Sequence, residues 1–162
     1  MRRNLHNFQK GFTLIELIVV IGIISILAAG VLTTLNPVTQ FQKADDARRK
    51  SDLSQIQKAL ETYYQDAGSY PPSNSSYQLP VPWGQSWQPY MNVLPGDPSS
   101  ANKYIYFSPV GGQAYYLYAS LGRGGSDPQA CFSNGSSCSN VPVGASCGGT
   151  CNFGLSSPNV SP

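Results

Sequence analysis

The chain has 162 residues, of which 41% are apolar and only 11% are charged, and its formal net charge is +2. This length suits one modest domain with an appendage and argues against two domains. The positive balance comes from Arg2, Arg3 and Lys10, because after Gly11 seven basic residues face all eight acidic ones. The bulk of the chain is therefore not a basic nucleic-acid binder by charge.

A run of 24 residues from Phe12 to Leu35 contains one charged residue, Glu16. A helix rises about 1.5 Å per residue, so this run is long enough to cross the ~30 Å hydrocarbon core of a membrane. Basic residues precede the run and the next one beyond it is Lys43, so the positive-inside rule places the N-terminus in the cytoplasm. We therefore expect a single membrane-spanning helix with the rest of the chain outside.

Two simpler interpretations of this run are open. A cleaved secretory signal ends in small residues, and residues 28–30 have that character. The run is too long for such a signal, however, and Glu16 falls in its most apolar part. A plain membrane anchor fits the length but leaves the carboxylate unexplained.

Glu16 needs a partner, because a carboxylate is costly inside a membrane. No Lys or Arg lies between Phe12 and Gln42 to pair with it. Cleavage between Gly11 and Phe12 would create an α-amino group four residues before Glu16. A helix points its own N-terminal amine away from its side chains, so the amine of a neighbouring copy is the expected partner. On this interpretation the buried charge sets the register of polymerisation.

The stretch KGFTLIELIVVIGIISILAAG, residues 10–30, closely resembles the N-terminus of type IV pilins and of the pseudopilins of type II secretion. The resemblance implies that a prepilin peptidase removes residues 1–11 and methylates the amine of Phe12. It also implies that Glu16 pairs with the amine of an adjacent subunit. The helix would wait in the inner membrane and then join a helical filament in the periplasm or at the cell surface.

Beyond this run, Pro37 removes a backbone donor, so a kink or a break is expected near Asn36. An amphipathic helix is predicted over residues 37–68, because apolar residues follow at alternating spacings of three and four, namely Leu53, Ile56, Leu60, Tyr63 and Ala67. Gly68 marks its end. The charges of residues 45–50 are interpreted as its solvated face. The likeness to pseudopilins and small pilins covers roughly the first seventy residues.

Residues 69–130 are predicted to form a long loop and a small antiparallel sheet. The loop aromatics Trp83, Trp87 and Tyr90 are expected to pin it to the core. Its segment LPGDP, residues 94–98, resembles the turn before the sheet of major pseudopilins. Strands are predicted at 103–109 and 114–120 around a glycine-containing hairpin, with a fainter third strand at 130–133. The sheet face expected to pack on the helix carries Ile105, Phe107, Tyr115 and Leu117.

Four cysteines lie in the tail 131–162, which is rich in Ser, Gly, Asn and Pro: Cys131, Cys138, Cys147 and Cys151. Two disulfides are predicted, since exported proteins meet oxidising surroundings. Three pairings are open, of which neighbours in order close the shortest loops. A zinc site is the alternative, although the first cysteine gap is wide for a ligand pair. Type IV pilins often fasten a C-terminal loop with a disulfide, which favours true pilins.

Major pseudopilins, by contrast, tend to carry an acidic calcium-binding loop after the sheet. The corresponding residues 121–130 supply only Asp127, and Asp97 is distant in sequence. Neither calcium nor a close match to that subfamily is therefore expected, and no metal or cofactor is predicted.

The expected fold class is α+β and pilin-like. Its parts are a cleaved leader (1–11), a membrane and filament-core helix (12–36), an amphipathic helix of the head (37–68), a loop and sheet region (69–130) and a cysteine-rich tail (131–162). The lone His6 lies in the leader and no catalytic set stands out, so no enzyme is expected.

The expected function is that of a processed subunit of a pilus-like or secretion filament. Its partners would be the prepilin peptidase, other copies, related pilins and the inner membrane. A minor pilin with an adhesive or DNA-uptake role, or a plain anchored binding protein, is the alternative. The head lacks a concentrated basic groove, so nucleic acid is not an expected partner.

Overall fold

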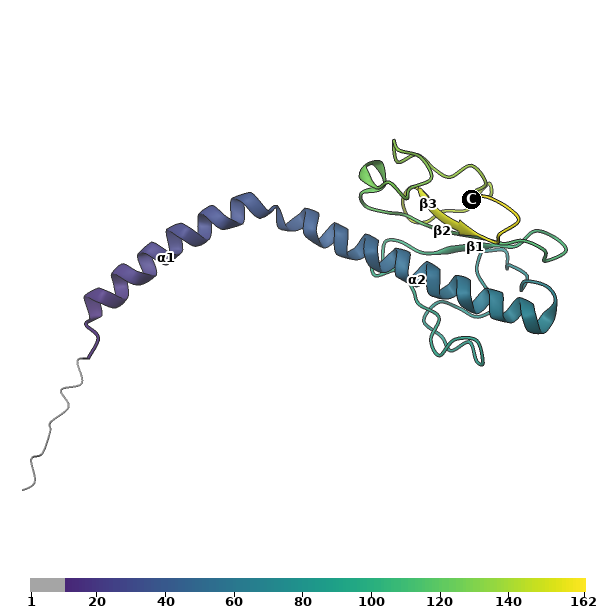
Figure 1. Ribbon diagram of the computed structural model, residues 1–162, viewed down its shortest axis with the longest axis horizontal. Coiled ribbons are helices and arrows are strands. Elements are labelled where there is room, and N and C mark those ends of the chain that lie inside the picture. The colour runs from purple at the N-terminus through teal and green to yellow at the C-terminus, as the bar shows by residue number, and fades with distance from the viewer. Residues whose placement is uncertain (1–10) are drawn as a thin grey trace, which may run out of the picture. The chain divides into compact units, whose positions relative to one another are not determined.

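The computed structural model describes residues 11–162, and for residues 32–35 it describes the backbone alone. The elements in chain order are α1 (Leu14–Leu35), α2 (Pro37–Ala67), β1 (Ile105–Phe107), β2 (Tyr116–Ala119), the short 3-10 helix η1 (Gly124–Ser126) and β3 (Phe153–Ser156) (Figure 1). The chain divides into two compact units, Met1–Gln40 and Phe41–Pro162. The predicted leader lies outside the described residues except for Gly11.

The two helices are separated by a single residue, Asn36, whose backbone is left-handed with φ 38° and ψ 76°. Asn tolerates this region better than most residues do. Pro37 opens α2, where its missing N–H removes no helical hydrogen bond. The chain thus has a break between two helices at this point.

The predicted apolar stripe of α2 faces the core of the head. Leu53, Ile56 and Leu60 are completely buried, and Tyr63 packs at the margin of the core, whereas Ala67 is exposed. Gly68 adopts φ 69° and donates its N–H to the carbonyl of Tyr64 at 2.8 Å, which closes the last turn. The predicted end of the helix is confirmed.

The sheet has the order β1-β2-β3, and both neighbouring pairs are antiparallel. Glycines at the hairpin between β1 and β2 adopt positive φ, 101° at Gly111 and 61° at Gly112. The third strand predicted at 130–133 is wrong, because that segment forms bends and turns. The true third strand, β3, is the sequence FGLS after the last cysteine. Its single glycine and short length conceal the alternation that marks a strand.

The predicted orientation of β1 is also wrong. Tyr104 and Tyr106 pack against α2 together with Leu117, while Ile105 packs with Tyr118 on the opposite face. A period of two shows which residues share a face but not which face is covered by the helix. Tyrosine fits the helix side because its ring is apolar and its hydroxyl finds a polar partner there.

The loop between α2 and β1 is held by aromatic contacts. Trp87 is buried and stacks on Tyr63 with ring centroids 5.8 Å apart, and Trp83 meets the ring of Tyr104 edge-on at 5.9 Å. Tyr90 packs on Tyr63 at 5.0 Å. The prediction that these aromatics pin the loop to the core is confirmed.

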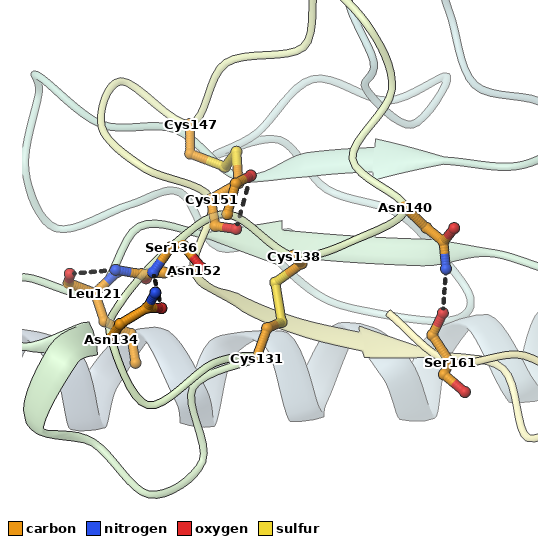
Figure 2. Close-up of a disulfide and its surroundings, with 11 residues drawn as sticks. Leu121, Cys131, Asn134, Ser136, Cys138, Asn140, Cys147, Cys151, Asn152 and Ser161 are labelled. Atoms are coloured by element: carbon orange, nitrogen blue, oxygen red, sulfur yellow. Dashed lines mark hydrogen bonds between the residues drawn. A yellow bond between two sulfur atoms is a disulfide. The ribbon is translucent and has the colours of Figure 1, made fainter.

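Residues 131–151, which we call the lid, cover the face of the sheet that points away from α2 (Figure 1). Two disulfides staple the lid, one joining Cys131 to Cys138 and the other Cys147 to Cys151 (Figure 2). The amide N–H of Cys138 donates to the carbonyl of Cys151 at 2.9 Å, which joins the two loops. All four thiols are consumed, so the zinc alternative is wrong. The α+β pilin-like fold with a disulfide-stapled C-terminal region is confirmed.

Candidate assembly site

The start of α1 forms a reciprocal cap. Thr13 is the N-cap residue, and its hydroxyl accepts a hydrogen bond from the backbone N–H of Glu16 at 3.3 Å. In return, Oε2 of Glu16 accepts bonds from the backbone N–H of Thr13 at 2.9 Å and from its hydroxyl at 2.8 Å. The helix N-terminus also carries a partial positive charge. The carboxylate of Glu16 is thus stabilised within its own chain.

Sequence reasoning missed Thr13 as this partner. A cation is the obvious partner for a carboxylate, and no Lys or Arg follows Glu16 before Lys43. The signal was present as the pattern Thr-x-x-Glu directly before an apolar run, which marks a capping box. The acid therefore has a neutral local partner before any second chain is considered.

Only one oxygen of the carboxylate is used. Both bonds from Thr13 end on Oε2, and Oε1 accepts no hydrogen bond from the described residues. A carboxylate has about four acceptor positions, so Glu16 retains the capacity to bind an external donor.

The surface of α1 is apolar and uncovered. None of the window from Leu14 to Val31 is buried, and among the described residues this is the one helix long and apolar enough to cross a membrane. Phe12 is 88% exposed and Leu14 is 75% exposed. Such a continuous apolar surface marks a helix that lies in lipid or against other chains.

The predicted processing residues lie directly before this helix. Gly11 and Phe12 precede the cap, and a Cβ added at Gly11 would meet no atom within 4 Å. Packing within the chain therefore does not require glycine at this position. The cysteines, in contrast, belong to the second unit and form its two staples.

A second polar cluster, in the head, joins α2 to two loops. The guanidinium of Arg49 donates to both oxygens of Asp97, at 2.9 and 3.0 Å, and to Oδ1 of Asp46 at 2.9 Å. The side chains of Arg49 and Asp46 are each 5% exposed, and that of Asp97 is fully buried. The bonds with Asp97 raise the pKa of Arg49 against the opposing effect of burial.

The interpretation of residues 45–50 as a solvated face is therefore wrong for Asp46 and Arg49. The charges are present at helical spacing, but the loop carrying Asp97 covers part of that face. A single sequence does not show which distant acid a helical arginine will meet. The LPGDP turn thus supplies the acid that anchors its loop to α2.

Comparisons with known proteins agree with the likeness seen in the sequence. The family model of the prokaryotic N-terminal methylation motif matches residues 6–32, and that of type II secretion system (T2SS), protein G, matches residues 36–131. No solved structure matches the chain.

Three similar relatives are each named type II secretion system core protein G. The protein of Pseudomonas aeruginosa is 35% identical over 138 residues, covering 78% of this chain and 94% of that protein. The protein of Escherichia coli strain K12 is 33% identical over 117 residues, covering 67% and 79%. The protein of Vibrio cholerae is 33% identical over 108 residues, covering 62% and 72%.

The expectation that the cysteine tail and the poorly acidic loop separate this chain from the major pseudopilins is wrong. The protein G model extends through Cys131, so it spans the loop, the first two strands and the segment after β2. The chain therefore belongs to the type II secretion system protein G family of pseudopilins.

Proposed function

We propose that this chain is a structural subunit of a type II secretion pseudopilus. A prepilin peptidase cleaves it between Gly11 and Phe12 and methylates the new amine. The observation that carries the proposal is the carboxylate of Glu16, one turn into a membrane-length helix whose apolar surface is uncovered. The methylation-motif match over residues 6–32 supports the same assignment.

Assembly would proceed through a change of partner at Glu16. Before cleavage, the cap formed with Thr13 satisfies the carboxylate and allows the helix to remain in the inner membrane. After cleavage, the α-amino group of Phe12 in a neighbouring copy approaches Oε1. Methylation keeps this amine basic, so the two charges attract strongly in a medium of low dielectric constant. The apolar side chains of α1 then pack against the helices of other copies.

The proposed topology places the leader in the cytoplasm and the disulfide-stapled head outside. The three basic residues before Phe12 support this orientation. The disulfides support it as well, because such bonds persist in oxidising compartments. The head would therefore fold in the periplasm before the helix leaves the membrane.

The variant Glu16→Gln tests the assembly role, because it removes the charge and keeps the size of the side chain. We expect processing to continue but filaments to fall by about tenfold or more, since the amide cannot form the intersubunit ion pair. Cross-linking of cells and electron microscopy of sheared filaments measure assembly. The intact mass of the protein measures leader removal.

Ser25→Ala is the matched control in the same helix. The hydroxyl of Ser25 donates to the carbonyl of Ile21 at 2.7 Å, so it is satisfied locally and its loss should leave assembly unchanged. If a processed Glu16→Gln chain formed as many filaments as the wild type, the proposed assembly mechanism would be contradicted. A wild-type chain that keeps its leader and remains monomeric would instead indicate a plain membrane anchor.

A further inference from the structure

The likeness to major pseudopilins implies a calcium-binding loop after the sheet. The segment in question, residues 121–130, follows β2 and contains η1. Calcium in proteins takes six to eight oxygen ligands, with several carboxylate oxygens among them. A calcium site at this segment would therefore need nearby carboxylate oxygens that are not already bonded.

The acid within the segment is already occupied by nitrogen donors. Oδ2 of Asp127 accepts from the ammonium group of Lys50, and Oδ1 accepts from the backbone N–H of Gln129 at 2.9 Å. Burial opposes ionisation of Asp127, but the bonds from Lys50 and Gln129 outweigh it, so its pKa lies below the ordinary value. This carboxylate is a charged acceptor, and each of its two oxygens already accepts from a nitrogen donor.

The nearby acids are occupied in the same way. Asp46 accepts from the backbone N–H of Gly122 at 2.8 Å and of Arg123 at 3.0 Å, in addition to Arg49. Both carboxylate oxygens of Asp97 accept hydrogen bonds from Arg49. Between residues 11 and 162, no group of three His, Cys, Asp or Glu side chains is placed to hold a metal ion. The donor set therefore does not fit calcium.

The same contacts hold the segment in place. Lys50, on α2, reaches Asp127 in the segment and lies 5.8 Å above the ring of Phe153 in β3. The side chains of Lys50 and Asp127 are 22% and 16% exposed, so water screens their pairing only in part. Asn152 holds Leu121, the first residue of the segment, by two hydrogen bonds of its side-chain amide (Figure 2). Its Oδ1 accepts from the N–H of Leu121, and its Nδ2 donates to the carbonyl of Leu121.

We propose that the ammonium group of Lys50, with the carboxylate of Asp46, anchors residues 121–130 in this chain in place of a bound calcium ion. The cation is part of α2 itself, so the head folds and stays folded whatever the calcium concentration outside the cell. This inference concerns the isolated subunit and does not depend on polymerisation. A failure here would leave the proposed filament role untouched.

The first test is thermal unfolding of the full chain in detergent, before assembly, in EDTA and in millimolar CaCl2. Because no site binds the ion, the two melting temperatures should agree within about 1 °C, and MgCl2 at the same concentration should give the same value. A calcium-specific rise of several degrees would overturn the proposal.

The second test asks whether Lys50 provides the anchor. Trypsin cleaves after Arg123, which lies inside the segment, so the rate of this one cut, followed by mass spectrometry, reports local opening. Lys50→Met should raise that rate by about fivefold, since the pair with Asp127 is lost while the apolar stem is kept. Lys58→Met is the matched control, because Lys58 lies exposed on the same helix and forms no ion pair with the described residues.

A third variant distinguishes local opening of the segment from general unfolding of the head. Asp127→Asn removes the negative charge of the segment and leaves α2 intact, and it should raise the same cleavage by a similar factor. The double variant should cleave no faster than Lys50→Met, because both changes remove the same pair between Lys50 and Asp127. Cleavage that is unchanged in Lys50→Met, or effects of the two changes that multiply, would show that the pair does not hold the segment.

Discussion

At the scale of single residues, three buried tyrosines of the head donate their hydroxyl groups to acids of α2. The hydroxyl of Tyr104 donates to Asp52 at 2.8 Å, and those of Tyr70 and Tyr115 donate to Glu61 at 3.0 and 3.1 Å. Burial is the main cause that raises the pKa of each phenol, so each stays a protonated donor. Asp52 and Glu61 are therefore structural acceptors.

Two tyrosines on opposite faces of the sheet give a matched prediction. Tyr104→Phe deletes the donor to the buried Asp52, so the free energy of unfolding should fall by about 1 kcal/mol. Tyr118 is equally buried, but its hydroxyl has no partner among the described residues, so Tyr118→Phe should be neutral or slightly stabilising. Urea unfolding of the two variants checks the difference, and equal losses would contradict the assignment.

The arginines of α2 give a second matched pair. Arg49→Met leaves Asp97 and Asp46 buried without their cation, which should cost about 3 to 5 kcal/mol of unfolding free energy. Its neighbour Arg48 is 62% exposed and lies 3.9 Å from Asp52, so Arg48→Met should cost less than about 1 kcal/mol. Urea unfolding of the full chain in detergent measures both, and a mild effect of Arg49→Met would show that the cluster is dispensable.

At the scale of elements, the sequence predicts what depends on local pattern. The stripe of Leu53, Ile56 and Leu60, the stop at Gly68 and the hairpin glycines follow from spacing and backbone preference, and the structure bears them out. Two features depend instead on contacts with distant segments. They are the face of β1 that packs against α2 and the position of β3 in the chain. Neither is encoded in local periodicity.

The same distinction applies to the two polar sites. The position of Glu16 in a membrane-length run is visible from sequence, and its Thr13 partner lies within the same turn. Asp46 and Arg49 lie three residues apart on α2, but Asp97 meets them only because a loop 48 residues along the chain from Arg49 returns to the helix. A contact of that sequence separation is set by tertiary packing and needs either a structure or aligned relatives.

The lid is the element that depends most on covalent staples. It supplies Cys138, Cys147 and Cys151, which are buried together with Ile105 and Tyr118 of the sheet. Replacing either pair by Ala should lower the free energy of unfolding by about 2 kcal/mol, because the cross-links close short loops of seven and four residues in sequence separation. Urea unfolding with and without reductant tests this, and reductant should then have less effect on each variant than on the wild type. A double-Ala variant as stable as the wild type would contradict the role of that staple.

At the scale of the whole molecule, the chain divides its tasks between two compact units. The first contains the apolar helix α1 with its one capped acid, and the second holds all the buried core residues, both disulfides and the ion pairs of α2. Among the residues whose burial the structure describes, every buried one belongs to the second unit. Folding of the head should therefore be independent of what happens to the leader, whereas assembly should depend on it.

A block at the cleavage position separates these two properties. Gly11→Asp places a charged side chain beside the proposed cut, and the open surroundings of Gly11 mean that the chain itself tolerates it. The leader should stay attached, no free amine should form at Phe12, and filaments should be lost, while the urea midpoint of the head stays unchanged. The wild-type chain in cells without prepilin peptidase is the matched control and should behave identically. Normal filaments from an uncleaved Gly11→Asp chain would mean that the apolar helix assembles without the new amine, and a destabilised head would mean that the two units are coupled.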